Sequence, residues 1–301
     1  MPIVCIRHTT TYRYRAPVSF GEHRMMLRPL ESFDQRLLSA AVSISPEPSL
    51  QRDIHDAGGA CIGVVRFDTA ADRLVFDSCM RVDHRPQAPA DLEAAFLTSG
   101  AAEAIYERDE LETLAPFRRR LHTDAGETQA WAARFVQAQG ATRLADLLTD
   151  MMQAIRSEFA YALRLRGKPQ TPDETLRLRQ GSCRDFALLM MEAARSLGLA
   201  AQFVSGYVYS TSAKAGRTGG GHTHAWTRIY LPQSGWVDFD PTNGIVGNLD
   251  LIRVAVVADP RLALPLWGVW DGRADDFLGM DVAVQLDVES LQQSLPSLRT
   301  A

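Results

Sequence analysis

The first third of the chain is a series of short runs in which hydrophobic and polar positions alternate, a pattern typical of half-buried β-strands. The runs are rich in Val, Ile, Tyr, Phe and Thr, and breaks such as Pro46-Glu47-Pro48 and Gly58-Gly59 separate them. Strands at this spacing favour an antiparallel sandwich or barrel. The strands that we expect cover residues 3–15, 18–30, 37–45, 61–69 and 72–84.

The period of the pattern becomes helical in the middle of the chain. Apolar residues recur every three or four positions over residues 142–161, which predicts one face of an amphipathic helix. A second helical stripe covers residues 183–197 and stops at Gly198, a residue type that often follows a helix C-terminus. Strand-like runs come after it, at residues 201–209, 223–231, 236–240, 251–258 and 280–288.

These patterns predict an α+β protein of two domains, joined by a proline-containing linker at residues 86–89. The first domain, residues 1–90, is expected to be an antiparallel β-sandwich. The second domain, residues 91–301, is expected to be helical over residues 91–198 and to form a β-sheet over residues 199–290.

The charge of the chain excludes some classes of partner. The 301 residues carry a formal net charge of -4 and the pI is about 6.0, so no overall positive field would attract nucleic acid or an anionic membrane. The basic runs at residues 118–120 and 164–168 are more typical of solvated faces than of binding patches. We therefore expect neither a nucleic-acid partner nor a membrane partner.

Cysteine usage and the absence of a long apolar run indicate a cytoplasmic protein. No secretory signal pattern and no run of about 18 apolar residues is present in the sequence. The four cysteines are Cys5, Cys61, Cys79 and Cys183, and none of them forms a C-x-x-C pair. This spacing predicts neither a zinc site nor a disulfide framework.

One of these cysteines begins the second predicted helix. Ser182 followed by Asp185 is a capping-box pattern, which makes Cys183 the first helical residue. A thiolate at that position lies at the positive end of the helix dipole, and the Cys183 amide has no partner within the helix. A free amide beside a nucleophile is what an oxyanion hole requires. The alternative is that Cys183 is a small, buried apolar residue.

A histidine and an aspartate come next, on a predicted β-hairpin that follows a glycine-rich loop at residues 216–221. We expect that loop to be mobile. His224 and Asp240 share a face only in one register. A loop that pairs Tyr230 with Trp236 makes them diagonal neighbours, about 7–8 Å apart between Cα atoms. A loop that pairs Leu231 with Trp236 puts them on opposite faces.

Each of these residues also has a simpler interpretation. His224 alone could be an interior histidine, and Asp240 precedes a proline, where aspartate often begins a turn. His222 and His224 have the spacing of metal ligands on a strand, with Cys183 as a conceivable third ligand, but no second ligand cluster accompanies them. Asp238 competes with Asp240 as the partner of the histidine, at a greater distance in the favourable register.

The motifs together resemble a known family. G-S-C-R-D-F-A at 181–187, T-H-A-W at 223–226 and G-W-V-D-F-D-P-T-N-G at 235–244 look like the three core motifs of bacterial transglutaminase-like proteins, which belong to the papain-like superfamily. H-T-T-T-Y-R-Y at 8–14 and P-V-S-F-G-E-H-R-M-M-L-R-P at 17–29 resemble the β-rich N-terminal region of the same proteins. The resemblance implies a transglutaminase-type core after an N-terminal β-domain.

The resemblance also implies roles for single residues: Cys183 as nucleophile, His224 as base and Asp240 as the residue that orients the histidine. Tyr161 occupies the place of an aromatic pair that precedes the core in relatives, and we treat it as a candidate for the wall of the pocket.

Such a triad performs acyl transfer on an amide through a cysteine thioester. We expect hydrolysis of a peptide or isopeptide bond, with a peptide or protein as the partner and with no metal or organic cofactor. The alternatives are amine transfer to a glutamine carboxamide, as in a transglutaminase, and a non-catalytic binding module on the same fold. The sequence leaves the oligomeric state open.

Overall fold

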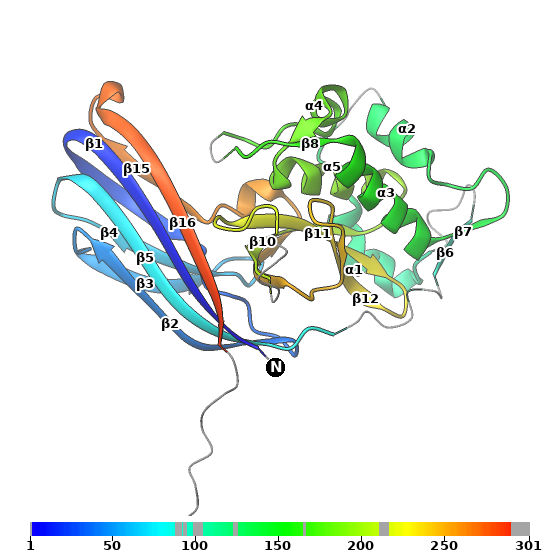
Figure 1. Ribbon diagram of the computed structural model, residues 1–301, viewed down its shortest axis with the longest axis horizontal. Coiled ribbons are helices and arrows are strands. Elements are labelled where there is room, and N and C mark those ends of the chain that lie inside the picture. The colour runs from blue at the N-terminus through cyan, green and yellow to red at the C-terminus, as the bar shows by residue number, and fades with distance from the viewer. Residues whose placement is uncertain are drawn as a thin grey trace, which may run out of the picture.

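The computed structural model describes residues 2–87, 92, 95–98, 105–122, 126–164, 167–210 and 217–289. The observed class is α+β, as the sequence predicts. Two sheets carry the fold: a curled sheet, which lies on the left in Figure 1, and a second sheet between it and most of the helices.

The curled sheet has seven strands and is built around one long strand, β1 (Ile3–Met25). The first half of β1 pairs with β5 and β16, and its second half pairs with β4 and β15. The pairing with β5 shifts register between Arg13 and Val18, around Pro17. A proline cannot donate to the ladder and is tolerated at such an irregularity, so two predicted strands form one bent strand. The partners of β1 and their neighbours are β2 (Gln35–Ser45), β3 (Leu50–His55), β4 (Cys61–Arg66), β5 (Ala71–His84), β15 (Leu266–Asp271) and β16 (Phe277–Glu289).

The last strand corrects one sequence-based expectation. We assigned the run at residues 280–288 to the sheet of the second domain, but β16 pairs with β1 from Ile3–Glu289 to Tyr14–Phe277. Figure 1 shows the two strands side by side, although they are the two ends of the described chain. β1 exposes two edges and β5 covers only one of them, so β16 supplies the second row of partners. The domain boundary near residue 90 stays a prediction.

The second sheet is antiparallel and has the order β13-β12-β11-β10-β14. Its strands are β10 (Ala201–Val208), β11 (His224–Leu231), β12 (Gly235–Asp240), β13 (Ile245–Val246) and β14 (Leu251–Val257). The helices are α1 (Arg108–Arg118), α2 (Glu127–Ala133), α3 (Leu144–Glu158), α4 (Pro172–Leu178) and α5 (Cys183–Ser196), with short 3-10 helices η2 (Pro260–Leu262) and η3 (Ala274–Asp276). Short strand pairs are β6 (Phe96–Thr98) with β7 (Ala141–Arg143), and β8 (Ala160–Tyr161) with β9 (Gln180–Gly181).

The central helix, α5, is buried on nearly all sides, because α2, α3, α4 and the second sheet all pack against it. Its polar residues are satisfied internally. Glu192 pairs with Arg195 at 3.2 Å, and Arg195 also donates to the carbonyl oxygens of Ala201 and Ala258. On the side of the sheet, Thr227 Oγ1 donates to the Ala187 carbonyl oxygen at 2.7 Å. These contacts hold the N-terminus of α5 at a defined place over β11. Among the helices that the structure describes, none is long and apolar enough to cross a membrane.

A buried ionic cluster joins the two sheets. Arg253 of β14 donates to Asp34, in the segment just before β2, and to Asp238 of β12 at 3.3 Å. Gln35 donates to the Arg253 carbonyl oxygen at 2.8 Å, and Asn248 also donates to Asp34. Charges taken out of water are tolerated only when they are paired, so this cluster fixes how the curled sheet meets the second sheet.

Removal of the cation from this cluster is expected to be costly. In Arg253→Ala, the buried carboxylate of Asp34 loses its ionic partner, so the free energy of unfolding should fall by about 3–5 kcal/mol in denaturant titrations. Arg261 pairs with Asp259 at the surface, where its side chain is 79% exposed, and Arg261→Ala should cost less than about 1 kcal/mol. Equal losses for the two variants would contradict the structural role of the buried cluster.

Candidate active site

The N-terminus of α5 places Cys183 as the sequence predicts. Ser182 precedes the helix, and the Asp185 carboxylate accepts hydrogen bonds from the Ser182 amide at 2.7 Å and from its hydroxyl at 2.8 Å. Arg164 pairs with the same carboxylate at 2.5 Å, so the charge of Asp185 is neutralised. Cys183 is thus the first helical residue and is 6% exposed. Its amide is one of those that an α-helix leaves without an internal partner.

A second polar group lies beside the sulfur. Tyr161 ends β8, which pairs in parallel with β9, the strand that leads directly into α5. The Tyr161 hydroxyl is buried, and among the described residues it makes no hydrogen bond of normal geometry. Burial and the neighbouring Cys183 sulfur raise the pKa of Tyr161, so the phenol stays protonated as a donor. The sequence suggested a wall position for Tyr161, and the structure adds that its hydroxyl faces the cysteine.

The hairpin adopts the register that brings histidine and aspartate together. Tyr230 pairs with Trp236, so a tight turn with Gln233 at a positive φ joins β11 to β12. His224 and Asp240 then lie on one face, and His224 Nε2 is 2.8 Å from Asp240 Oδ2. Because an ionised carboxylate only accepts, Nε2 carries the proton of this hydrogen bond. The other ring nitrogen, Nδ1, is left for the sulfur.

Charge and burial act together on this pair. Burial alone would lower the pKa of His224, but attraction to Asp240 and the hydrogen bond between them outweigh it, and the Cys183 thiol adds to the effect. Together they raise the pKa of His224 to about 10. Burial opposes ionisation of Asp240 as well, yet the pKa of Asp240 is lowered, because His224 and three further donor groups stabilise the carboxylate. The pair is therefore an imidazolium and a carboxylate.

One residue that sequence analysis did not single out completes the arrangement. The Asn243 side chain donates to Asp240 Oδ2 at 2.8 Å and to the Thr218 carbonyl oxygen at 3.1 Å, and its oxygen accepts from the Thr218 amide. Asn243 thereby ties the aspartate to the loop before β11. Its position in a D-P-T-N-G turn suggested only a turn, because the contact is between segments far apart in the sequence.

The described part of the glycine-rich loop is anchored, which differs from the mobile loop that we expected. Arg217 donates to Asp250 at 2.9 Å, and Asn243 holds Thr218. Gly219 has a φ of 86° and lies against the imidazole, since a Cβ built there would be 2.8 Å from His224 Nδ1. A glycine is required here both for the backbone angle and for room beside the ring.

The alternative partners and ligands lie elsewhere. Asp238 accepts from Trp226 Nε1 at 2.7 Å and pairs with Arg253, so it is engaged away from His224. Trp226 itself stacks on the His224 ring, with centroids 5.9 Å apart. His222 precedes β11. Within the described ranges, no group of three or more His, Cys, Asp or Glu side chains is placed to hold a metal ion.

Cys183 and His224 open into a cleft of about 540 Å³. One wall is the curled sheet, through residues 8–12 of β1 and 280–282 of β16. The opposite wall comes from residues 163, 164 and 167–169 and from the start of α5, and residues of the segment 260–266 also line the cleft. The candidate site therefore lies where the two sheets meet.

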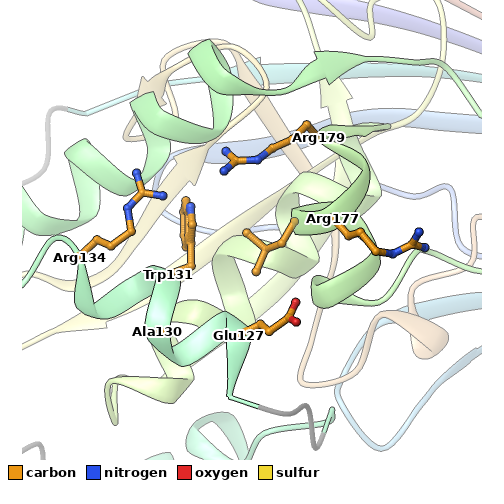
Figure 2. A pocket seen from close by; sticks show the side chains of 7 residues that line it. Glu127, Ala130, Trp131, Arg134, Arg177 and Arg179 are labelled. Atoms are coloured by element: carbon orange, nitrogen blue, oxygen red, sulfur yellow. The ribbon is translucent and has the colours of Figure 1, made fainter.

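A second depression, of about 390 Å³, lies between α2 and α4 on the helical side. Figure 2 shows Trp131 between Arg134 and Arg179, with Arg177 directed away from the ring. Glu158 pairs with Arg179 at 2.6 Å and with Arg134 at 3.4 Å, so both cations already have an ionic partner. The depression contains none of the predicted catalytic residues.

Comparison with known proteins identifies the family. Residues 129–241 match the model of the transglutaminase-like superfamily, and residues 4–83 match that of the bacterial transglutaminase-like N-terminal region. An uncharacterized protein of Mycobacterium tuberculosis is 30% identical over 280 residues, which cover 88% of this chain and 86% of the relative. This chain belongs to the bacterial transglutaminase-like family.

Other members and a solved structure agree with this assignment. An uncharacterized Mycobacterium leprae protein is 26% identical over 280 residues, covering 93% of this chain and 96% of the relative. The crystal structure of a proposed cysteine protease from Cytophaga hutchinsonii aligns with a TM-score of 0.69 at 16% identity, covering 98% of this chain and 92% of the other. At that identity the likeness concerns the fold, and it spans both the curled sheet and the transglutaminase-like core.

The His224–Asp240 pair predicts a distinctive titration. In the unmodified protein, the imidazole should stay protonated until the pH approaches about 10. In Asp240→Asn the favourable charge is gone and burial remains, so the pKa should drop below the ordinary value of about 6.5. NMR of the ring nitrogens measures both values. Asp281→Asn, which removes a carboxylate exposed on β16, is the control and should leave the titration of His224 unchanged.

Proposed function

We propose that this protein is a thiol-dependent enzyme that cleaves a peptide or isopeptide bond, with Cys183 as nucleophile, His224 as base and Asp240 as orienting residue. The observation that carries the proposal is the buried 2.8 Å contact between His224 and Asp240, which leaves Nδ1 of the ring without a hydrogen-bond partner among the described residues, while the Cys183 sulfur lies close enough to act on the pKa of the ring. A nucleophile, a base and an orienting group in this order constitute the arrangement that activates a cysteine. Membership of the transglutaminase-like superfamily supports a cysteine-dependent enzyme of this general kind.

The first half of the reaction is acylation. Since His224 is an imidazolium, the proton of the Cys183 thiol already resides on Nδ1, and the thiolate attacks the carbonyl carbon of the amide. The tetrahedral intermediate carries a negative oxygen, for which the Cys183 amide and the Tyr161 hydroxyl are the proposed donors. The C–N bond then breaks as His224 returns the proton to the leaving amine, and a thioester of Cys183 remains.

The second half removes the acyl group. Water attacks the thioester while the neutral His224 accepts its proton, and the Cys183 thiolate departs, so that the products are a carboxylic acid and the free enzyme with its thiolate–imidazolium pair restored. Transfer to a lysine amine would need the same thioester and a site that attracts the ammonium group. None of the described residues that line the cleft is Asp or Glu, which favours water over a cationic acceptor.

The proposal is tested by product analysis. The protein and its Cys183→Ala variant are each incubated with a mixed peptide library and a labelled primary amine, and mass spectrometry separates cleavage, deamidation and amine incorporation. We expect cleavage products that depend on Cys183. Cys79→Ala, which alters an exposed cysteine on β5, should retain them. Identical product profiles for the protein and Cys183→Ala would refute an enzymatic role, and amine incorporation in place of cleavage would establish the transferase alternative.

Tyr161→Phe isolates the proposed second oxyanion donor. Loss of one such donor typically lowers kcat by about 100-fold to 1,000-fold, and we expect a reduction of that order on the best peptide of the library. The free energy of unfolding should not fall, because the deleted hydroxyl is buried without a conventional partner among the described residues. An unchanged kcat would remove Tyr161 from the mechanism.

A further inference from the structure

The cleft beside Cys183 has one wall that carries no charge. From β1 it receives His8, Thr10 and Tyr12, and from β16 Met280 and Val282. Burial lowers the pKa of His8 to about 4, so this histidine is neutral at physiological pH. Its Nδ1 is 3.0 Å from the Tyr207 hydroxyl, which fixes the ring in the wall. The curled sheet thus contributes a neutral surface to the cleft.

The cations of the cleft lie outside the curled sheet, in the rest of its lining. Besides His224, whose charge Asp240 balances, the charged residues that line the cleft are Arg164, Lys168, Arg184 and Arg261, and no carboxylate stands among the described lining residues. Two of these cations are compensated from outside the cleft, because Arg164 pairs with Asp185 and Arg261 pairs with Asp259, each at 2.5 Å.

The other two cations have no ionic partner in the described parts of the chain. Among the described residues, the Arg184 guanidinium, directly after the nucleophile in sequence, donates to the carbonyl oxygens of Arg164 and Gly167, at 2.7 and 3.1 Å. Those oxygens orient the group but leave its charge uncancelled. Lys168 is exposed at the rim of the cleft and forms no ion pair there. The depression between α2 and α4 differs, because Glu158 forms an ion pair with two of its arginines.

This charge distribution runs against that of the whole molecule. The chain has a formal net charge of -4, yet the cleft that contains the candidate nucleophile concentrates uncompensated positive charge. A cleft with low-dielectric walls focuses the field of the charges that line it and attracts ligands of the opposite sign. The ligand chemistry that fits two such cations is a carboxylate, which accepts charge-assisted hydrogen bonds from both ammonium and guanidinium groups.

We propose that the cleft selects peptides that carry a carboxylate close to the scissile bond, held by Lys168 and Arg184. This inference rests on the proposed function for the position of the bond, and on the charges of the cleft for the carboxylate. The carboxylate can belong to an Asp or Glu side chain or to a free C-terminus, two sources with the same chemistry.

Peptide binding tests the inference without turnover. Fluorescent alanine pentapeptides with Glu or Gln at each position in turn, and with a free or amidated C-terminus, are titrated onto the Cys183→Ala variant. The charged members should bind at least about 10-fold more tightly than their neutral partners. The Glu/Gln pairs report on a side-chain carboxylate, and the acid/amide pairs report on a C-terminal one. Equal affinities within every pair, including no binding of either member, would overturn the inference.

Charge reversal at the rim supplies the matched variants. Lys168→Gln, built into Cys183→Ala, should reduce the preference for charged peptides by roughly 3-fold and Lys168→Glu by roughly 10-fold, because the second change reverses the sign of the charge. Arg52→Glu reverses an exposed charge on β3, outside the cleft, and should leave the preference unchanged. A preference that persists in Lys168→Glu, or that Arg52→Glu weakens equally, would contradict the assignment.

Alkylation of Cys183 gives an independent readout of the same field. Iodoacetate is anionic and iodoacetamide is neutral, so the ratio of their rates reports the potential beside the sulfur. The ratio should fall in Lys168→Gln, fall further in Lys168→Glu and remain unchanged in Arg52→Glu. If Cys183 reacts with neither reagent, the proposed function is contradicted, whereas the peptide affinities still decide the inference.

Discussion

The hydrogen bond between His224 and Asp240 is the contact on which the rest of the candidate site depends. Both side chains are fully buried, and neither charge would be tolerated there without the other. The pair exists because β11 and β12 meet in the register that aligns Tyr230 with Trp236; a shift by one residue would turn Asp240 away from the ring. Asn243 and the backbone after Asp240 supply the remaining donors that a buried carboxylate needs.

Local sequence rules predicted the parts of the site that depend on neighbouring residues. The Ser182–Asp185 capping pattern is local, so it located the start of α5 and the place of Cys183 correctly. The alternation of side chains along a strand is also local. It showed that His224 and Asp240 lie on the same face or on opposite faces of the hairpin depending on which of two loop lengths joins the strands. That choice required the structure, because both lengths are common between antiparallel strands.

What the sequence did not predict depends on contacts between distant segments. Asn243 acts through Thr218, across 25 residues of chain, and nothing in its local pattern indicates that partner. The alternation in β16 predicts a strand but not its neighbour, which is β1 at the opposite end of the described chain. For the same reason the curled sheet could not be recognised from sequence as a wall of the cleft. The buried cluster around Arg253 now explains how that wall is held in place.

The central claim is that His224 and Asp240 make Cys183 a reactive thiolate. The most direct measurement is the order in which the four cysteines react with limiting iodoacetamide at neutral pH. Peptide mapping identifies which cysteine has been modified. If accessibility alone set the rate of alkylation, Cys79, which is exposed, would react before Cys183, which is 6% exposed. Burial raises the pKa of Cys5 and Cys61, as do the carboxylates of Glu289 and Asp53. The account predicts that Cys183 is modified first and that His224→Ala abolishes this priority. Modification of Cys79 first, with Cys183 equally slow in both proteins, would contradict it.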